Sequence, residues 1–144
     1  MNVRTRRCPP AAAAVALFAA CYTGFALARM LLALHPRLAL AAEWSFMATP
    51  GFALLAHARF IRATARMPRP RERATLLWGS WLAVAAVALA GYAWLRWSMR
   101  GSGMQLPLPL LQFGVPLLLH WLLLWGAYAR RCSDWLLERQ RRGR

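Results

Sequence analysis

The chain has 144 residues, of which 60% are hydrophobic and 16% are charged, and its formal net charge is +15. A soluble domain of this length cannot bury so much apolar surface, so the composition excludes an ordinary soluble globular domain. A basic chain could also bind nucleic acid, but the positions of the arginines along the chain argue against that class.

The apolar residues fall into four separate blocks. Each block is about 23 residues long, which at 1.5 Å of rise per helical residue crosses a hydrocarbon core ~30 Å thick. The sequence therefore predicts an all-α membrane protein: a four-transmembrane-helix bundle with short outer loops, formed as one domain. The predicted spans are residues 11–34, 38–61, 75–97 and 106–129 of the domain 1–144.

The first block also has features of a secretory signal peptide. A basic N-terminus precedes it, and Ala26-Leu27-Ala28 fits the small-x-small pattern of a cleavage site. Against cleavage, the apolar stretch is longer than the core of a signal peptide and resumes after Arg29. We therefore favour a retained helix, with cleavage after Ala28 as the alternative.

Small side chains recur every four residues along the first block and would form a stripe on one helix face. In lipid, such stripes allow close helix contact, because van der Waals packing drives association there. The third block has a similar series, so we expect the first and third helices to make the tightest contacts, within one chain or between chains. The candidate packing stripe is Ala12, Ala16, Ala20, Gly24 and Ala28, and the second series is Gly79, Ala83, Val87 and Gly91.

Two ionisable residues flank the predicted first outer turn. Arg29 lies seven residues before Pro36 and Glu43 lies seven residues after it, so a chain reversal at that proline places both at the same depth. We expect them to pair as an interhelical salt bridge that fixes the first hairpin. In the functional alternative, Glu43 is the proton- or cation-coupling carboxylate of a transporter.

Two histidines are weaker polar candidates. His57 is expected at the inner membrane interface because it lies beside Arg59 and Arg62, and His120 is expected to donate a hydrogen bond to another helix. A haem held between them is not expected, because helical rise separates their depths by about 7 Å. The cysteines and histidines show no metal-binding spacing, so the sequence predicts neither a metal site nor a cofactor.

Tryptophans lie near both predicted membrane surfaces, which is typical of an aromatic belt. After the last span, a short helical tail is expected, with Ser133 or Asp134 as its N-cap. The tryptophans are Trp44, Trp94 and Trp97 at the outer level, Trp78 and Trp81 at the inner level, and Trp121 and Trp125 in the inner half of the last span.

The positions of the arginines predict the orientation. Fifteen of the 19 basic residues lie in the N-terminal segment, in and beside the loop 62–74, and in the tail 130–144. By the positive-inside rule these three regions are cytoplasmic, which gives an N-in/C-in topology. They are expected to contact anionic lipid headgroups, and no nucleic-acid partner is expected. All 19 are arginine, which suggests a GC-rich bacterial genome and hence the bacterial inner membrane.

No nucleotide-binding loop, serine elbow or pair of carboxylates is found in the sequence, so an enzyme is not expected. We interpret the chain as a small multi-pass inner-membrane protein, an accessory or scaffold subunit of a membrane assembly. Its protein partner would be a larger membrane protein or a second copy of itself. The alternative is a small oligomeric ion-coupled transporter that uses Glu43 and Arg29. The sequence identifies neither a substrate nor a partner.

Overall fold

The computed structural model describes residues 10–33, 45–98 and 114–142, and these form five helices. Two of them, α1 and α3, are long and apolar enough to cross a membrane, which is consistent with a helical membrane protein. The first four helices lie within or across the four apolar blocks, and the fifth lies in the basic tail. The helices are α1 (Pro10–Ala33), α2 (Ser45–Thr64), α3 (Pro70–Ser98), α4 (Val115–Ala127) and α5 (Arg130–Arg142).

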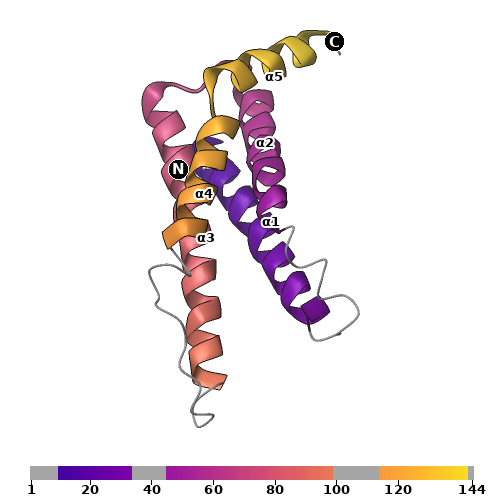
Figure 1. The fold of residues 1–144 in the computed structure, drawn as a ribbon. Coiled ribbons are helices and arrows are strands. Elements are labelled where there is room, and N and C mark those ends of the chain that lie inside the picture. Colours follow the sequence, from indigo (N-terminus) through magenta and orange to yellow (C-terminus); the bar gives the residue numbers. More distant parts are fainter. Residues whose placement is uncertain (1–9, 34–44, 99–113, 143–144) are drawn as a thin grey trace, which may run out of the picture.

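Successive helices from α1 to α4 run in opposite directions (Figure 1). Helix α1 packs against α2 and α3, and α4 packs against the same two helices. Helices α1 and α3 lie together near one end of the molecule and diverge toward the other (Figure 1). Helix α5 runs across the end at which α2 and α4 finish, and it packs on α2. The C-terminal helix therefore closes one end of the helical assembly.

The core lies near the end that α5 covers. On α2, Ala53, Ala56 and Phe60 are fully buried, and their spacing of three and four residues places them on one helix face. Alanines at this contact let the helix backbones approach, while phenylalanines fill the space that remains. The fully buried aliphatic and phenylalanine side chains of the described residues are Ala14, Phe18, Ala53, Ala56, Phe60, Ile61, Leu76, Val84 and Leu124.

The diverging halves of α1 and α3 expose large apolar side chains. Leu31 on α1 is 66% exposed, and Leu89 and Trp97 on α3 are 61% and 66% exposed. Soluble proteins seldom leave a large contiguous apolar surface open to water. These exposed halves are therefore suited to lipid or to contact with another protein.

Gly79 marks a close approach of α1 and α3. A Cβ atom built at Gly79 would lie 2.8 Å from Val15 Cγ1 and 2.9 Å from Val15 Cγ2. Carbon atoms in proteins pack at about 3.5–4.0 Å, so only glycine lets α1 lie this close to α3. The expected tight contact between the first and third blocks occurs here, with Val15 rather than the small-residue stripe facing Gly79.

The candidate packing stripe on α1 lies on another face of the helix. Ala16, Ala20, Gly24 and Ala28 are exposed, and Ala12 is partly buried. A Cβ atom at Gly24 would meet nothing within 4 Å. The role of the stripe in helix packing, within one chain or between chains, therefore stays a prediction.

Helix α2 is followed by an alanine with left-handed backbone geometry. Ala65 has φ 52°, and its N–H donates to the carbonyl of Ile61 at 2.7 Å, which is an αL C-cap. A side chain in this region costs about 1 kcal/mol, so we expect Ala65→Gly to raise the free energy of unfolding by about 0.5 kcal/mol in a denaturant titration. Ala63→Gly, within the exposed last turn of α2, should lower it by about 0.5–1 kcal/mol. Changes of the same sign would contradict the left-handed assignment.

Glu72 caps the start of α3 and holds the connection from α2. Its carboxylate accepts hydrogen bonds from the Arg66 guanidinium at 2.6 and 2.7 Å and from the backbone N–H of Arg69 at 2.8 Å. Pro70 is the first helical residue and Glu72 the third, so the carboxylate returns to the N-cap position as in a capping box. The hydrogen bonds from Arg66 and then Arg69 lower the pKa of Glu72 from 4.5 to about 2.

This lowered pKa predicts a pH-dependent stability. A carboxyl group whose pKa falls on folding stabilises the protein above its ordinary pKa and loses that effect as the pH falls to its folded pKa. The contribution of Glu72 should therefore be complete above about pH 4.5 and disappear between there and about pH 2. The Tm of the unaltered protein should exceed that of Glu72→Gln above this window and converge with it at the bottom. Glu138→Gln is the control, because its pair with Arg142 is solvent-exposed.

Helix α5 begins at Arg130, earlier than predicted. The prediction of Ser133 or Asp134 as the N-cap is wrong, because both residues lie inside the helix. The main chain makes a side-chain cap there unnecessary, since the backbone N–H groups of Cys132 and Ser133 reach the carbonyl of Ala129 at 3.1 and 3.3 Å. The Ser133 hydroxyl lies at 3.5 Å from the same Ala129 carbonyl and makes a shorter contact outside its own helix, at 3.1 Å from His57 Nε2.

Candidate functional site

Four polar side chains from different parts of the chain are buried together at the end that α5 covers. They are His57 on α2, Ser80 on α3, Tyr128 at the end of α4 and Ser133 on α5. None of them is more than 3% exposed. A polar group buried in this way is costly unless it is hydrogen-bonded, so the partners of each group define the site.

His57 links α2 to the last two helices. Its Nδ1 lies 3.1 Å from the carbonyl oxygen of Ala127, which can only accept, so in a neutral imidazole Nδ1 carries the hydrogen. Nε2 is then the acceptor, and the hydroxyl of Ser133, 3.1 Å away, donates to it. The side chain of His57 is fully buried, and its expected depth at the inner membrane interface stays a prediction. The covering helix α5 removes it from the surface.

Tyr128 extends the same cluster to α3. Its hydroxyl lies 2.8 Å from the hydroxyl of Ser80, and its ring centroid lies 5.5 Å from that of His57. Through Tyr128 and His57, hydrogen bonds therefore connect α2, α3, α5 and the end of α4. We call these four residues (His57, Ser80, Tyr128 and Ser133) the polar junction.

His120 forms a hydrogen bond between helices in a separate place, but as the acceptor and not as the expected donor. Its Nδ1 lies 2.7 Å from the carbonyl of Pro116 and therefore donates, which leaves Nε2 to accept from the Tyr22 hydroxyl at 3.4 Å. Tyr22 in turn stacks on Phe18, with ring centroids 5.8 Å apart. This cluster joins α4 to α1. In both His57 and His120, each of the two ring nitrogens therefore makes a hydrogen bond.

The structure does not test the predicted ion pair, since Glu43 lies outside the described residues. The pairing of Arg29 with Glu43 stays a prediction. Within residues 10–33, 45–98 and 114–142, no three His, Cys, Asp or Glu side chains gather closely enough to hold a metal ion.

The hydrogen bonds of the polar junction resemble those of a catalytic serine, its histidine general base and a third group that orients the histidine. The Ser133 hydroxyl donates to His57, which is oriented by a third group, the carbonyl of Ala127. A nucleophile must also reach its substrate, however, and Ser133 is only 3% exposed. The geometry therefore favours a structural role, in which the junction fastens α5 to α2.

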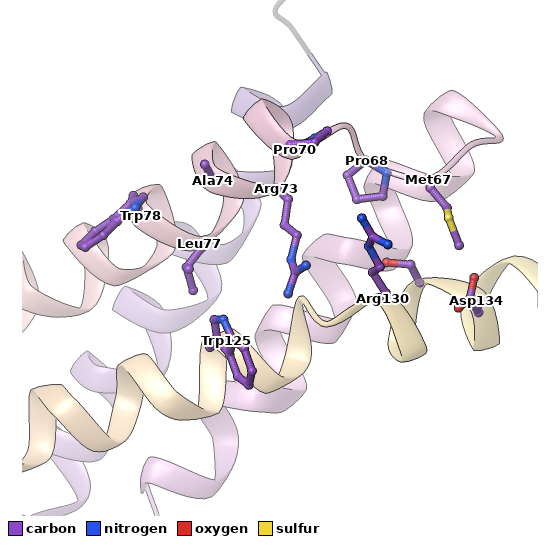
Figure 2. A pocket seen from close by; sticks show the side chains of 11 residues that line it. Met67, Pro68, Pro70, Arg73, Ala74, Leu77, Trp78, Trp125, Arg130 and Asp134 are labelled. Atoms are coloured by element: carbon purple, nitrogen blue, oxygen red, sulfur yellow. The ribbon is translucent and has the colours of Figure 1, made fainter.

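A pocket of about 650 Å³ lies beside the junction, between the start of α3 and the α4–α5 turn (Figure 2). Its volume falls within the ~300–1,000 Å³ of small-molecule sites. Two cations, Arg73 and Arg130, and one carboxylate, Asp134, line it together with Trp78 and Trp125. The pocket thus combines charged and aromatic walls.

Sequence reasoning missed both the pocket and three of the four junction residues. The available signal was that Ser80, Tyr128 and Ser133 are hydroxyl groups within or beside apolar blocks, where each needs a partner. The sequence does not say which groups meet, since His57 and Ser133 are 76 positions apart. Comparison of the chain with protein-family models, curated proteins and solved structures found no match.

Proposed function

We propose that this chain is a four-span protein of the bacterial inner membrane, with both termini in the cytoplasm, that acts as a non-catalytic scaffold or accessory subunit. The observation that carries the proposal is the small-residue stripe on α1, of which Ala16, Ala20, Gly24 and Ala28 are exposed in the part of the chain that the structure describes. Small residues in register let a second helix approach closely in lipid. The partner is a larger membrane protein or a second copy of this chain.

The distribution of charge over the fold supports the orientation. The connection from α2 to α3 and helix α5 lie at the same end of the molecule (Figure 1), and these two regions hold most of the described arginines. Arg29 and Arg96 lie near the C-terminal ends of α1 and α3, which point the other way. By the positive-inside rule, the arginine-rich end faces the cytoplasm and its anionic headgroups.

The buried polar groups support a structural rather than a catalytic role. In the polar junction and in the Tyr22–His120 contact, they hydrogen-bond from one helix to another. Such bonds fix how helices sit against one another, which is what a scaffold requires. They leave the exposed faces of α1 and α3 as the surfaces for a partner.

The test is affinity purification in mild detergent, with mass spectrometry of the proteins that accompany the chain. Gly24→Leu should reduce the recovered partner, or self-association, by at least about tenfold, because it adds bulk to the stripe at a position where a Cβ atom meets nothing within 4 Å among the described residues. Thr23→Leu is the matched control, since it adds bulk to the same exposed turn but off the stripe. Equal effects of the two variants would count against the stripe.

Glu43→Gln separates the scaffold from the alternative function. A scaffold should keep its partner and abundance when Glu43 loses its charge. Assembly that stays intact while a transport activity disappears would instead favour the ion-coupled transporter built on Arg29 and Glu43.

A further inference from the structure

The pocket at the start of α3 brings two arginines together from distant parts of the chain. Arg73 lies in the first turn of α3, and Arg130 is the first residue of α5. Figure 2 shows both side chains extending into the space between α3 and the α4–α5 turn. Two cations that share one pocket repel each other unless an anion lies between them.

These two arginines differ from Arg66, which is held by Glu72. Among the residues that the structure describes, neither the Arg73 nor the Arg130 guanidinium makes a hydrogen bond or an ion pair, although Asp134 lies on the same pocket wall. The hydrogen-bond donors of both side chains therefore remain available to a ligand. The three charged side chains sum to one net positive charge, which suits a singly charged anion.

Apart from Ser133, the remaining side chains of the pocket wall are mainly apolar. Leu77, Trp78 and Trp125 line it, and the two tryptophans are each about half exposed. Indole rings of this kind are typical of the headgroup level of a membrane. A ligand that fills the pocket must therefore combine an anionic group with a hydrocarbon part.

We propose that this pocket binds a membrane phospholipid, with its headgroup phosphate between Arg73 and Arg130 and an acyl chain along Leu77, Trp78 and Trp125. Guanidinium groups suit phosphate because they offer paired N–H donors in a fixed plane. Asp134 is placed to accept hydrogen bonds from a headgroup hydroxyl or ammonium group. The inference goes beyond the scaffold role and rests only on its membrane setting.

The position of the pocket fits this ligand. It lies at the arginine-rich end of the fold, where the proposed topology places the cytoplasmic headgroups. A lipid there would contact the start of α3, the end of α4 and the start of α5 at once. It would thereby join the α2–α3 connection to the C-terminal helix.

The test is native mass spectrometry of the full chain in mild detergent, titrated with dioleoyl phosphatidylglycerol. The unaltered protein should retain one lipid in a saturable way. Arg73→Gln/Arg130→Gln should weaken this binding by at least about tenfold. Arg59→Gln/Arg62→Gln removes the same charge from exposed positions at the end of α2, outside the pocket, and should change the binding by less than about twofold.

Two further ligands identify what the pocket recognises. Dioleoylglycerol, which lacks the phosphate, should not be retained, and inorganic phosphate at millimolar concentration should not displace the phospholipid. Retention of dioleoylglycerol would show that the apolar side chains alone account for the binding. Displacement by phosphate would show that the pocket binds free anions. Equal losses in the two arginine pairs would assign the binding to surface charge, so each of these results overturns the proposal.

The double variant Arg73→Lys/Arg130→Lys keeps both positive charges. It replaces Arg73→Gln/Arg130→Gln in the lipid-binding test if that variant fails to fold. Because an ammonium group lacks the planar pair of donors, lipid binding should weaken several-fold, and unchanged binding would contradict the assigned contacts. The measurement needs no protein partner. Loss of the lipid site would therefore leave the scaffold proposal intact, and failure to recover a partner would leave the lipid site intact.

Discussion

Gly79→Leu is expected to push α1 away from α3 and to lower the free energy of unfolding by about 2–3 kcal/mol. Even the first carbon of the new side chain would lie 2.8 Å from Val15 Cγ1. Val15 packs against the buried core, so it has little room to retreat. An equilibrium titration with SDS, followed by far-UV circular dichroism, measures the change.

Gly91→Leu is the matched control, because Gly91 lies on the same helix, three four-residue steps further along. It is exposed, and a Cβ atom there would meet nothing within 4 Å. Both variants replace a helical glycine with a good helix former, so the propensity gain of about 1 kcal/mol is common to them. The difference between the two then reports the contact with Val15, and a difference near zero would show that α1 does not lie against Gly79.

His57→Ala is expected to lower the free energy of unfolding by about 2–4 kcal/mol. The change leaves a cavity in a fully buried position and removes the hydrogen-bond partner of Ser133 and of the Ala127 carbonyl. Helix α5 should then detach from α2 more easily. Limited proteolysis of α5 should therefore accelerate in this variant.

A double-mutant cycle of His57→Ala with Ser133→Ala isolates their hydrogen bond. Ser133→Ala alone should cost about 1 kcal/mol, and the two changes together should cost less than their sum, with a coupling of about 1 kcal/mol. Ser98→Ala is the control, because among the described residues its hydroxyl donates to the Leu95 carbonyl within the exposed end of α3. Strict additivity of the His57 and Ser133 variants would show that the junction is not formed.

The apolar blocks predicted the positions of the helices well, and the ends less well. The third span was predicted over 75–97, whereas α3 runs from Pro70 to Ser98. Hydropathy reports only the segment that suits lipid, but a helix starts where its N–H groups are satisfied. Here Pro70 and the carboxylate of Glu72 begin the helix one turn before the apolar residues.

The face that α1 turns inward could not be read from its small residues alone. The same helix carries Val15, Phe18 and Tyr22, which lie on a different face and pack against the other helices. Two periodic patterns of similar length compete in such a helix, and the one with larger side chains fills the core. Similarly, Arg73 and Arg130 were interpreted only as orientation charges, because the sequence cannot show that they meet in one pocket.

The hydrogen bond between His57 and Ser133 also sets an order for the biogenesis of the chain. At about 5–20 residues per second, the ribosome needs roughly 4–15 s to add the 76 positions between them. During that time the His57 imidazole lacks its serine partner. It must then form a hydrogen bond with water or with a lipid headgroup, since an unsatisfied polar group in hydrocarbon is costly. Helix α2 therefore gains this hydrogen bond only after Ser133 on α5 has been synthesised. A chain truncated before Ser133 would leave the His57 imidazole without this hydroxyl donor.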